Sequence, residues 1–432
     1  MRLTRHLAGL ALAAAATLAL AAGAHAQDRK FRIGVITDQS GPLAAGGSSL
    51  HGLGARIMIE HFQRNGPIAG YALEAVYADA QSKPEVAINE ARRLIEQEKV
   101  DMLLGLFSSA QCVPMASRAE QLGTFLYITG CTASAALEGR NLRHVFRVQP
   151  SARQFGSAST DMIAAYAREK FGKDARDLTV AIIHEDGAYG VDVALGNEEG
   201  VKRNGLKLVV NQAYSAAAPD LSELVAKLRR AQPDVILHTG YNPDIALFLR
   251  QARESGLKFG ALVGHGAGYG QPAKLREALG ADIAGVFNVV PMSVQNANRA
   301  AMPADLPPLI ALITHAADNA RPGASGSPQV GIAASSTYLL LQHVLPRAIR
   351  QYGGTNADAL RRAALDVDLP EGGTMLGFGV KFLASGVDAG QNERAYPAIV
   401  EYTADGAEMV WPKSQQKRPP TLPLPSDHPY AR

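Results

Sequence analysis

The chain has 432 residues, 47% of them hydrophobic, and its 43 basic and 40 acidic residues leave a formal net charge of +3. The hydrophobic fraction is sufficient for full cores and argues against disorder outside the C-terminal end. The near balance of charge, without a basic tract that interleaves aromatic residues, excludes a nucleic-acid-binding class.

The first 26 residues have the pattern of a secretory signal peptide. Arg2 and Arg5 precede an apolar run over residues 7–22, and Ala24-His25-Ala26 supplies the small residues that signal peptidase needs. We expect cleavage before Gln27. The alternative is a membrane anchor, but the run is shorter than the about 20 apolar residues of a bilayer span. Because no cysteine lies near the cleavage site, we expect a periplasmic protein without a lipid anchor.

Short apolar strands alternate with amphipathic helices from Phe31 onward. Ser82-Lys83-Pro84-Glu85 has the sequence of a capping box and predicts a helix that ends at Glu98. The expected elements of this first series are strands over 31–37, 73–78, 102–106 and 124–129 and helices over 50–65, over 82–98 and from about 111. Short apolar strands with helical crossovers indicate a parallel sheet covered on both faces.

The same pattern restarts after residue 148. The expected elements of this second series are strands over 178–184, 206–210, 235–239 and 261–264 and helices over 191–204, over 221–231 and after 242–244. Residues 297–329 predict a crossing segment with a broken helix, and 331–352 a long helix. Late strands are expected at 380–383 and 398–402, and the proline-rich stretch after Trp411 predicts a poorly ordered tail. We therefore predict two doubly wound α/β lobes with a ligand cleft between them.

Ligands bind outside the carboxyl ends of the strands in such sheets, which directs attention to the loops there. Ser108 and Ser109 follow a buried strand at the start of a helix, where hydroxyl and backbone N–H groups suit a carboxylate. The alternative is an ordinary serine N-cap. A second small-residue loop follows the next strand. It contains Gly130, Cys131, Thr132 and Ala133.

Tyrosines occupy the corresponding loops of the second lobe. Tyr189, Tyr241 and Tyr269 offer flat apolar surface with a polar tip, which suits a small organic ligand. The alternative is interdomain packing. A ligand role is favoured for Tyr189 and Tyr241 but not for Tyr269.

Two further sets of residues could carry chemistry. Cys112 and Cys131 could form a disulfide in an exported protein, or they could be two small buried hydrophobic side chains. His184, His238 and His265 end three strands, but their separate loops favour hydrogen-bonding or structural roles over a zinc site. No nucleophile–base pair, phosphate loop or dinucleotide motif is present, so we predict no catalytic residues, no metal and no cofactor.

Several short motifs carry a resemblance to a known family. They are Ser40-Gly41-Pro42-Leu43, 79–84 ahead of Leu94-Ile95, 100–105, Ser108-Ser109, Asp186 with Tyr189-Gly190, and Gly240-Tyr241 with 249–253. Their order and spacing from about residue 31 to 412 resemble the type I periplasmic binding proteins of the leucine/isoleucine/valine-binding kind, which serve ATP-driven (ABC) importers.

The resemblance implies roles for the loop residues. Ser108 and Ser109 would donate to a ligand carboxylate, Gly130–Ala133 would line the site, and Tyr189 and Tyr241 would be the pocket tyrosines. Amino-acid binders of the family place a glutamate that pairs with the ligand ammonium where this chain has Gly266. An unpaired buried ammonium is costly. We therefore expect either a substitute acid for a branched-chain amino acid, such as Glu185 or Asp186, or an aromatic or aliphatic carboxylate or amide as ligand.

The resemblance also implies a division of the chain. Lobe 1 would comprise residues 27–148 and about 290–372, lobe 2 residues 149–289 and about 373–412, and 413–432 a C-terminal tail. The lobes would close about hinges near 148–152 and two later crossings. We expect a monomer that passes a small-molecule solute to an inner-membrane permease with a cytoplasmic ATPase. The alternatives are a binding protein that presents its ligand to a membrane receptor and, less favoured, an exported hydrolase.

Overall fold

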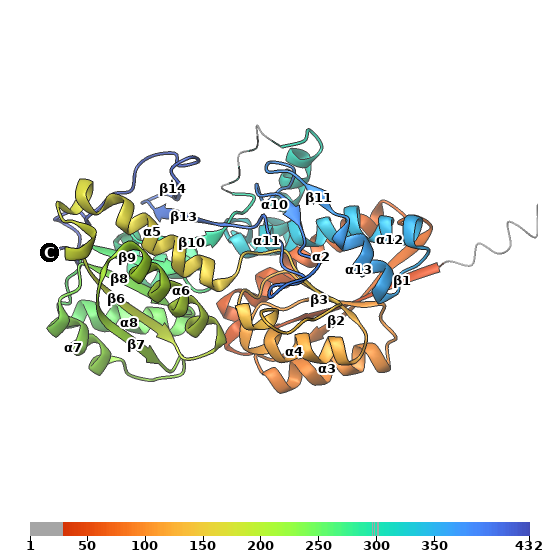
Figure 1. Ribbon diagram of the computed structural model, residues 1–432, viewed down its shortest axis with the longest axis horizontal. Helices are drawn as coiled ribbons and strands as arrows, with labels where there is room; N and C mark the ends of the chain where they lie inside the picture. Colours follow the sequence, from red (N-terminus) through yellow and green to blue (C-terminus); the bar gives the residue numbers. More distant parts are fainter. Residues whose placement is uncertain (1–28, 296, 298, 300–301) are drawn as a thin grey trace, which may run out of the picture.

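The computed structural model describes residues 29–295, 297, 299 and 302–432. The predicted signal peptide and its cleavage site lie outside the described residues. Two lobes, each built on one sheet, lie side by side (Figure 1). We call the lobe of the five-stranded sheet lobe 1 and the lobe of the seven-stranded sheet lobe 2. Within the described part of the chain, no helix combines the length and apolarity that crossing a bilayer requires.

Lobe 1 has a parallel sheet in the order β2-β1-β3-β4-β5. Its strands are β1 (Arg29–Thr37), β2 (Tyr71–Asp79), β3 (Met102–Gly105), β4 (Phe125–Ile128) and β5 (Val145–Arg147). The helices that connect these strands are η1 (Ala44–Ser48), α2 (Ser49–Arg64), α3 (Pro84–Glu96), α4 (Ser109–Gln121) and η2 (Ser134–Ala136). The strand order reverses between β1 and β3, which is where ligands bind in open α/β sheets.

A late segment of the chain completes lobe 1. Its helices are α10 (Leu306–Ala320), η6 (Ala324–Gly326), α11 (Pro328–Leu339), η7 (Leu340–Val344), α12 (Leu345–Tyr352) and α13 (Ala357–Leu365). Helix α11 packs closely on α2 because Gly54 has no side chain, and a Cβ there would collide with the Val330 carbonyl. The long helix predicted over 331–352 is present as the continuous segments α11, η7 and α12, of which η7 is a π-helical turn.

Lobe 2 has a sheet in the order β14-β13-β10-β9-β8-β6-β7. Its strands are β6 (Thr179–Glu185), β7 (Lys207–Tyr214), β8 (Val235–Thr239), β9 (Ala261–His265), β10 (Phe287–Pro291), β13 (Pro397–Tyr402) and β14 (Ala407–Trp411). Its helices are α5 (Ala152–Phe171), η3 (Ala175–Asp177), α6 (Ala188–Asn204), α7 (Ser222–Ala231), α8 (Asn242–Glu254), α9 (Pro272–Leu279) and η4 (Gly280–Ile283). The predicted two-lobe α/β fold is confirmed.

The sheet of lobe 2 is not parallel throughout. Strand β13 runs antiparallel to β10, and β14 runs antiparallel to β13. The short connection over 403–406 makes β13 and β14 a hairpin, which antiparallel strands alone can form. The predicted parallel sheet of this lobe therefore carries an antiparallel hairpin at one edge.

Helix α5 was not expected from the sequence. It begins with a capping box in which Ser151 and Gln154 exchange hydrogen bonds, and it ends at Gly172, whose φ is 64°. Its buried residues include Phe155, Met162 and several small residues, because the helix packs between the sheet and α6. Burial on more than one face removes the single apolar stripe by which a surface helix is recognised.

The capping box predicted at Ser82 is wrong. Lys83 is the N-cap of α3, and no side chain caps this helix. The Ser82 hydroxyl instead donates to the Ser40 carbonyl at 3.0 Å and accepts from the Leu43 backbone N–H at 3.0 Å. The hydroxyl therefore anchors the loop after β1 and is not available to the helix.

The late strand expected in lobe 2 at 380–383 lies elsewhere. Its counterpart β12 (Val380–Lys381) pairs with β11 (Asp368–Leu369) in a separate two-stranded sheet. Phe382 packs edge-on against Phe146 of β5, with ring centroids 5.3 Å apart. The aromatic residues near β12 are buried against lobe 1. The chain therefore returns to the sheet of lobe 2 only at β13.

The C-terminal tail is packed on lobe 2, so the prediction of a poorly ordered tail is wrong. The Tyr430 side chain is 1% exposed, and its ring stacks on Phe259 with centroids 5.2 Å apart. Its hydroxyl donates to the Leu249 carbonyl at 2.8 Å. Arg432 pairs with Asp234 at 3.0 Å. Prolines in the tail prevent regular structure but not burial of the Tyr430 ring near its end.

Candidate ligand-binding site

A small cavity lies between the lobes, beyond the carboxyl ends of their strands. Its volume is about 40 Å³. It is lined by Phe107, Ser109, Gly130, Thr132, Gln329 and Ile332 from lobe 1 and by Phe155, Tyr189, Tyr241, Gly266, Ala267 and Pro291 from lobe 2. We call it the inner cavity. Both lobes contribute to its walls, and none of these residues is charged.

A larger cavity of about 480 Å³ shares two lining residues with the inner cavity. We call it the outer cavity. Tyr189 and Tyr241 line both cavities, so their rings, with centroids 6.0 Å apart, form part of the boundary between them. The other residues that line the outer cavity are Pro42, Leu43, Ser82, Ser108, Ala110, Glu185, Gly187, Ala188, Ala216, Ala217, Ala218, Pro243 and Asp244.

Ser108 and Ser109 face the cleft without capping α4. Ser108 is the N-cap residue, but its side chain makes no capping hydrogen bond. The Ser108 side chain instead lies near the Tyr241 hydroxyl of lobe 2. Burial raises the pKa of the Tyr241 phenol well above its ordinary value, Glu185 and Tyr189 add to the effect, and the hydrogen bond with Ser108 opposes it. The Ser109 hydroxyl accepts the backbone N–H of Ala133 at 3.2 Å, which joins the two loops of lobe 1.

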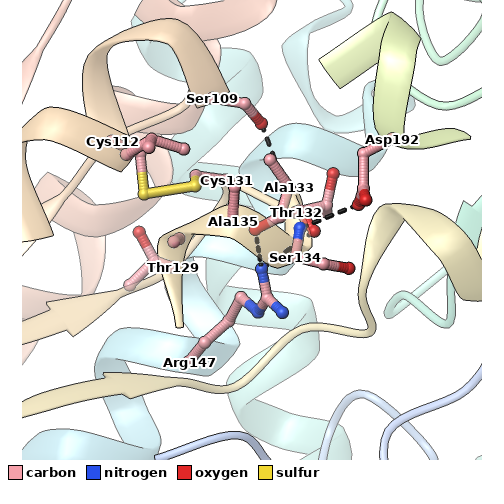
Figure 2. The surroundings of a disulfide bond; sticks show 12 residues. Ser109, Cys112, Thr129, Cys131, Thr132, Ala133, Ser134, Ala135, Arg147 and Asp192 are labelled. Carbon is pink, nitrogen blue, oxygen red and sulfur yellow. Dashed lines mark hydrogen bonds between the residues drawn. A yellow bond between two sulfur atoms is a disulfide. The ribbon is translucent and has the colours of Figure 1, made fainter. Parts of the chain in front are cut away.

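A disulfide and a buried arginine hold the loop over 130–134 (Figure 2). The disulfide joins Cys112 to Cys131, whose Cα atoms are 6.3 Å apart. The Arg147 guanidinium donates to the carbonyls of Thr132 at 2.8 Å and Ala133 at 2.6 Å. Burial lowers the pKa of Arg147 to about 10, and nearby carboxylates, Asp192 foremost, oppose this shift. Cys131 and Ala133 are fully buried and line neither cavity, so they support the loop from behind.

Tyr189 and Gly266 meet on the lobe 2 side of the inner cavity. The Tyr189 hydroxyl donates to the His265 carbonyl at 2.9 Å, which fixes the ring. Gly266 follows β9 with a φ of 40°, and a Cβ there would lie 2.8 Å from the Tyr189 hydroxyl oxygen. Tyr269 is fully buried and lines neither cavity, because its hydroxyl bonds to His238 at 2.7 Å inside the lobe.

Comparison with known proteins agrees with this geometry. A family model described as periplasmic binding protein matches residues 30–398. This chain belongs to the periplasmic binding protein family. The Leu/Ile/Val-binding protein homolog 7 of Brucella suis is 35% identical to it over 410 residues, which are 94% of this chain and 96% of the relative. The family and its relatives are binding proteins, so this periplasmic binding protein is not an enzyme.

Solved structures share its fold. A fatty acid ABC transporter substrate-binding protein from Thermomonospora curvata superposes with a TM-score of 0.73 at 18% identity, covering 89% of this chain and 92% of that one. A branched-chain amino acid transporter substrate-binding protein from Streptococcus pneumoniae, solved with isoleucine, gives 0.69 at 20% identity, with coverages of 89% and 100%. At such identities the likeness establishes the type I periplasmic binding protein fold and nothing about the ligand.

The three strand-end histidines of this periplasmic binding protein have separate hydrogen-bond partners. His238 bonds to Tyr269 at 2.7 Å and to Tyr214 at 2.8 Å, and burial lowers its pKa to about 3. His265 contacts Thr239 at 3.0 Å, and His184 contacts the Glu185 carbonyl at 2.8 Å. In the described ranges no group of three or more His, Cys, Asp or Glu side chains is placed to hold a metal ion.

Two carboxylates border the outer cavity of the binding protein, and each is fixed by lobe 2. Glu185 accepts the backbone N–H groups of Gly187 at 2.6 Å and Gly190 at 2.5 Å. Asp244 accepts the Tyr214 hydroxyl at 2.6 Å and the Tyr241 N–H at 3.0 Å. Burial is the largest cause that raises the pKa of both groups, to about 6 for Asp244. The described part of the chain gives neither carboxylate a salt-bridge partner.

Sequence reasoning missed part of the lining. The missed residues are Phe107, Phe155, Ala267, Pro291, Gln329 and Ile332. Phe107 lies next to Ser108 in sequence and could have been found from its loop. Gln329 and Ile332 lie on α11, far along the chain from the other lobe 1 residues, and no local motif marks them. Only the packing of α11 on α2 brings them to the cleft.

Proposed function

We propose that this protein is the solute-binding component of an ABC importer. After removal of a signal peptide it would act in the periplasm as a monomer and pass its ligand to an inner-membrane permease with a cytoplasmic ATPase. Membership of the Leu/Ile/Val-binding type supports this role. The low-identity structures that share the fold include two transporter binding proteins.

The observation that carries the proposal is the inner cavity, which both lobes line. A ligand that contacts both lobes binds the closed form better than the open form and so shifts the population toward closure. The chain passes between the lobes after β5, after β10 and before β13. We expect the hinges at these passages, the first of them over 148–152.

The polarity of the inner cavity supports a ligand with an oxygen acceptor and no buried ammonium. Ser109 and Thr132 offer hydroxyl groups there. The first N–H groups of α4 lack partners within the helix and favour negative charge. Phe107, Phe155 and Ile332 suit an aromatic or aliphatic body. No carboxylate lines this cavity to pair with an ammonium, which would be costly to bury unpaired.

The size of the inner cavity supports a ligand that reaches further. A volume of about 40 Å³ is small for any such acid. We infer that the ligand body extends past Tyr189 and Tyr241 into the outer cavity, or that the closed form adjusts around it. An aromatic or aliphatic carboxylate is therefore the proposed ligand class, with Ser108, Ser109, Gly130, Thr132, Tyr189, Tyr241 and Gly266 around it.

The test is ligand binding by the mature protein, unfolded and refolded to remove carried-over solute. Thermal shift and calorimetry would compare aromatic and aliphatic acids, amides and amino acids. We expect saturable binding of acids without an α-ammonium. Binding only of amino acids would overturn the proposed ligand class. Binding of no compound in the panel would likewise overturn it. Uptake of the bound acid by cells with and without the gene would then test the importer role.

A further inference from the structure

Gln329 lines the inner cavity from the first turn of α11. Its side-chain oxygen Oε1 lies 3.3 Å from His51 Nδ1. The residue is 7% exposed, and its amide nitrogen Nε2 has no hydrogen-bond acceptor in the described part of the protein. The cavity wall therefore holds an amide whose oxygen is occupied and whose N–H groups are free.

His51 is the partner of the amide oxygen. It lies fully buried on α2, and its Nε2 contacts the Thr129 hydroxyl at 2.8 Å. Burial lowers the pKa of His51 to about 4, although the bond to Gln329 opposes the shift, so the ring is neutral and carries one N–H. Because the Gln329 oxygen can only accept, that N–H is on Nδ1, and Nε2 accepts from Thr129.

The packing around His51 leaves this arrangement little freedom. Its ring lies against Phe107, with centroids 6.2 Å apart. A Cβ on Gly130 would lie 2.8 Å from His51 Cε1, so a glycine is needed where the loop crosses the ring. The imidazole is therefore held between Phe107 and Gly130, both of which line the inner cavity.

We propose that Gln329, held by His51, donates an amide N–H to an acceptor oxygen of the ligand and sets the preference of the site for such an oxygen over an ammonium. The inference rests on the proposed solute-binding function and adds to it a specificity-determining residue and its positioning residue. An ammonium placed there would meet the amide N–H groups, because His51 occupies the amide oxygen. Two features therefore disfavour an ammonium in the inner cavity. Gln329 presents N–H groups to it, and no carboxylate is among the residues that line the cavity.

The test compares ligand pairs that differ only in the α-ammonium. The pairs are 4-methylpentanoate with leucine and 3-phenylpropanoate with phenylalanine, and calorimetry measures the Kd of each. We expect the wild-type protein to prefer the acids. A hydrogen bond to a charged group contributes about 1.5–3 kcal/mol, so Gln329→Glu should weaken acid binding by about 10-fold or more and reduce or reverse the preference. If this variant fails to fold, Gln329→Met removes the donor without adding charge and should weaken acid binding in the same direction.

His51 is tested through the acid-to-amino-acid ratio of Kd values, which a purely structural role would not change. His51→Phe keeps an aromatic ring but frees the amide to turn its oxygen toward the ligand, so the preference for acids should shrink. His51→Asn keeps an N–H donor near the position of Nδ1 and should restore the preference. Gln212→Glu makes the same change on β7, where the side chain accepts from Lys227, and should leave the ratio unchanged.

The outcomes separate the two proposals. A wild-type protein that binds the acids while Gln329→Glu and Gln329→Met keep the same Kd and ratio would overturn the role of Gln329 alone. A ratio unchanged in His51→Phe, or not restored in His51→Asn, would overturn the positioning role of His51. A wild-type protein that binds neither acid, or prefers the amino acids, would overturn the ligand class and this inference together.

Discussion

The backbone N–H of Ser134 donates to the Asp192 carboxylate at 2.7 Å, and the two residues belong to different lobes (Figure 2). Ser134 begins η2 of lobe 1, and Asp192 lies on α6 of lobe 2. Asp192 also accepts from Arg153 at 3.2 Å, and Arg153 reaches Glu138 of lobe 1 at 3.3 Å. Because Asp192 is 6% exposed, the bond is shielded from water. Because its two residues belong to different lobes, the bond can form only when the lobes are close.

Asp192→Ala should therefore shift the protein toward its open form and weaken ligand binding. A buried hydrogen bond to a charged group contributes about 1.5–3 kcal/mol, which corresponds to about 10-fold or more in Kd. Calorimetry and small-angle scattering would measure affinity and opening. Asp161→Ala is the control, since Asp161 pairs with Arg203 inside lobe 2. Equal effects of the two substitutions would contradict a role for Asp192 in closure.

Removal of the disulfide should loosen the two loops that line lobe 1's side of the cleft. Cys112 and Cys131 are 19 residues apart, so the cross-link is expected to contribute about 3 kcal/mol through the entropy of the unfolded chain. The double variant Cys112→Ala, Cys131→Ala should unfold at lower urea and bind ligand more weakly. Reductant should destabilise the wild-type protein but not the double variant. A wild-type protein insensitive to reductant under unfolding conditions would contradict this expectation.

Asp244 should make stability depend on pH between its ordinary and its raised pKa. Burial raises this pKa from 3.8 to about 6, so the folded protein holds the proton more tightly than the unfolded chain. The resulting stabilisation is present below pH 3.8 and is lost as the pH rises through about 6. At about 1.36 kcal/mol per pKa unit, the difference in unfolding free energy between wild type and Asp244→Asn should change by about 3 kcal/mol. Urea unfolding at pH 3 and pH 7 would measure it, and a constant difference would refute the assignment.

Gly266→Glu should not create an amino-acid binder, although it restores the acid that such binders place in this loop. The φ of 40° strains any side chain, and a Cβ would lie 2.8 Å from the Tyr189 hydroxyl oxygen and 3.1 Å from the Phe155 ring. We expect a loss of about 1–3 kcal/mol in unfolding free energy and no gain in leucine binding. Gly266→Ala separates backbone strain from the effect of the carboxylate. A Gly266→Glu variant that has wild-type stability and binds leucine would contradict the claim that this loop cannot accept a side chain at position 266.

Tyr430→Ala tests the packing of the C-terminal tail. The substitution removes a buried ring that stacks on Phe259 and a hydrogen bond to Leu249. Truncation of a large buried aromatic residue costs about 3–5 kcal/mol, and urea unfolding would measure the loss. Tyr77→Ala, at a tyrosine that is 36% exposed, should cost much less. Comparable losses at the two positions would contradict the specific burial of Tyr430.

Local sequence was enough to predict the central strands of both lobes and the loops that follow them. The strand over 235–239 has the predicted bounds, because five consecutive buried residues between turn signals have few alternatives to a central strand. The loops with Ser109, Thr132, Tyr189 and Tyr241 lie around one cavity because parallel strands bring their carboxyl ends to one edge of each sheet. The family resemblance carried the assignment of roles to these loops.

The rest depended on contacts between residues far apart in the chain. Ser82 has a capping sequence, yet its hydroxyl bonds to a loop some forty positions earlier. Tyr430 follows a proline-rich stretch, yet its ring is buried because Phe259 of another segment offers a flat apolar partner. In both cases tertiary packing prevailed over local preference.

By itself the sequence determined the α/β class, the two-lobe organisation and the loops that face the cleft, since periodicity and turn residues act over short distances. Only the tertiary structure decided which side chains share the cavity wall. His51 and Gln329 are 278 positions apart, and nothing local to either residue predicts their contact. The contact exists because α2 and α11 pack together, and it occupies the side-chain oxygen of a residue that lines the cavity.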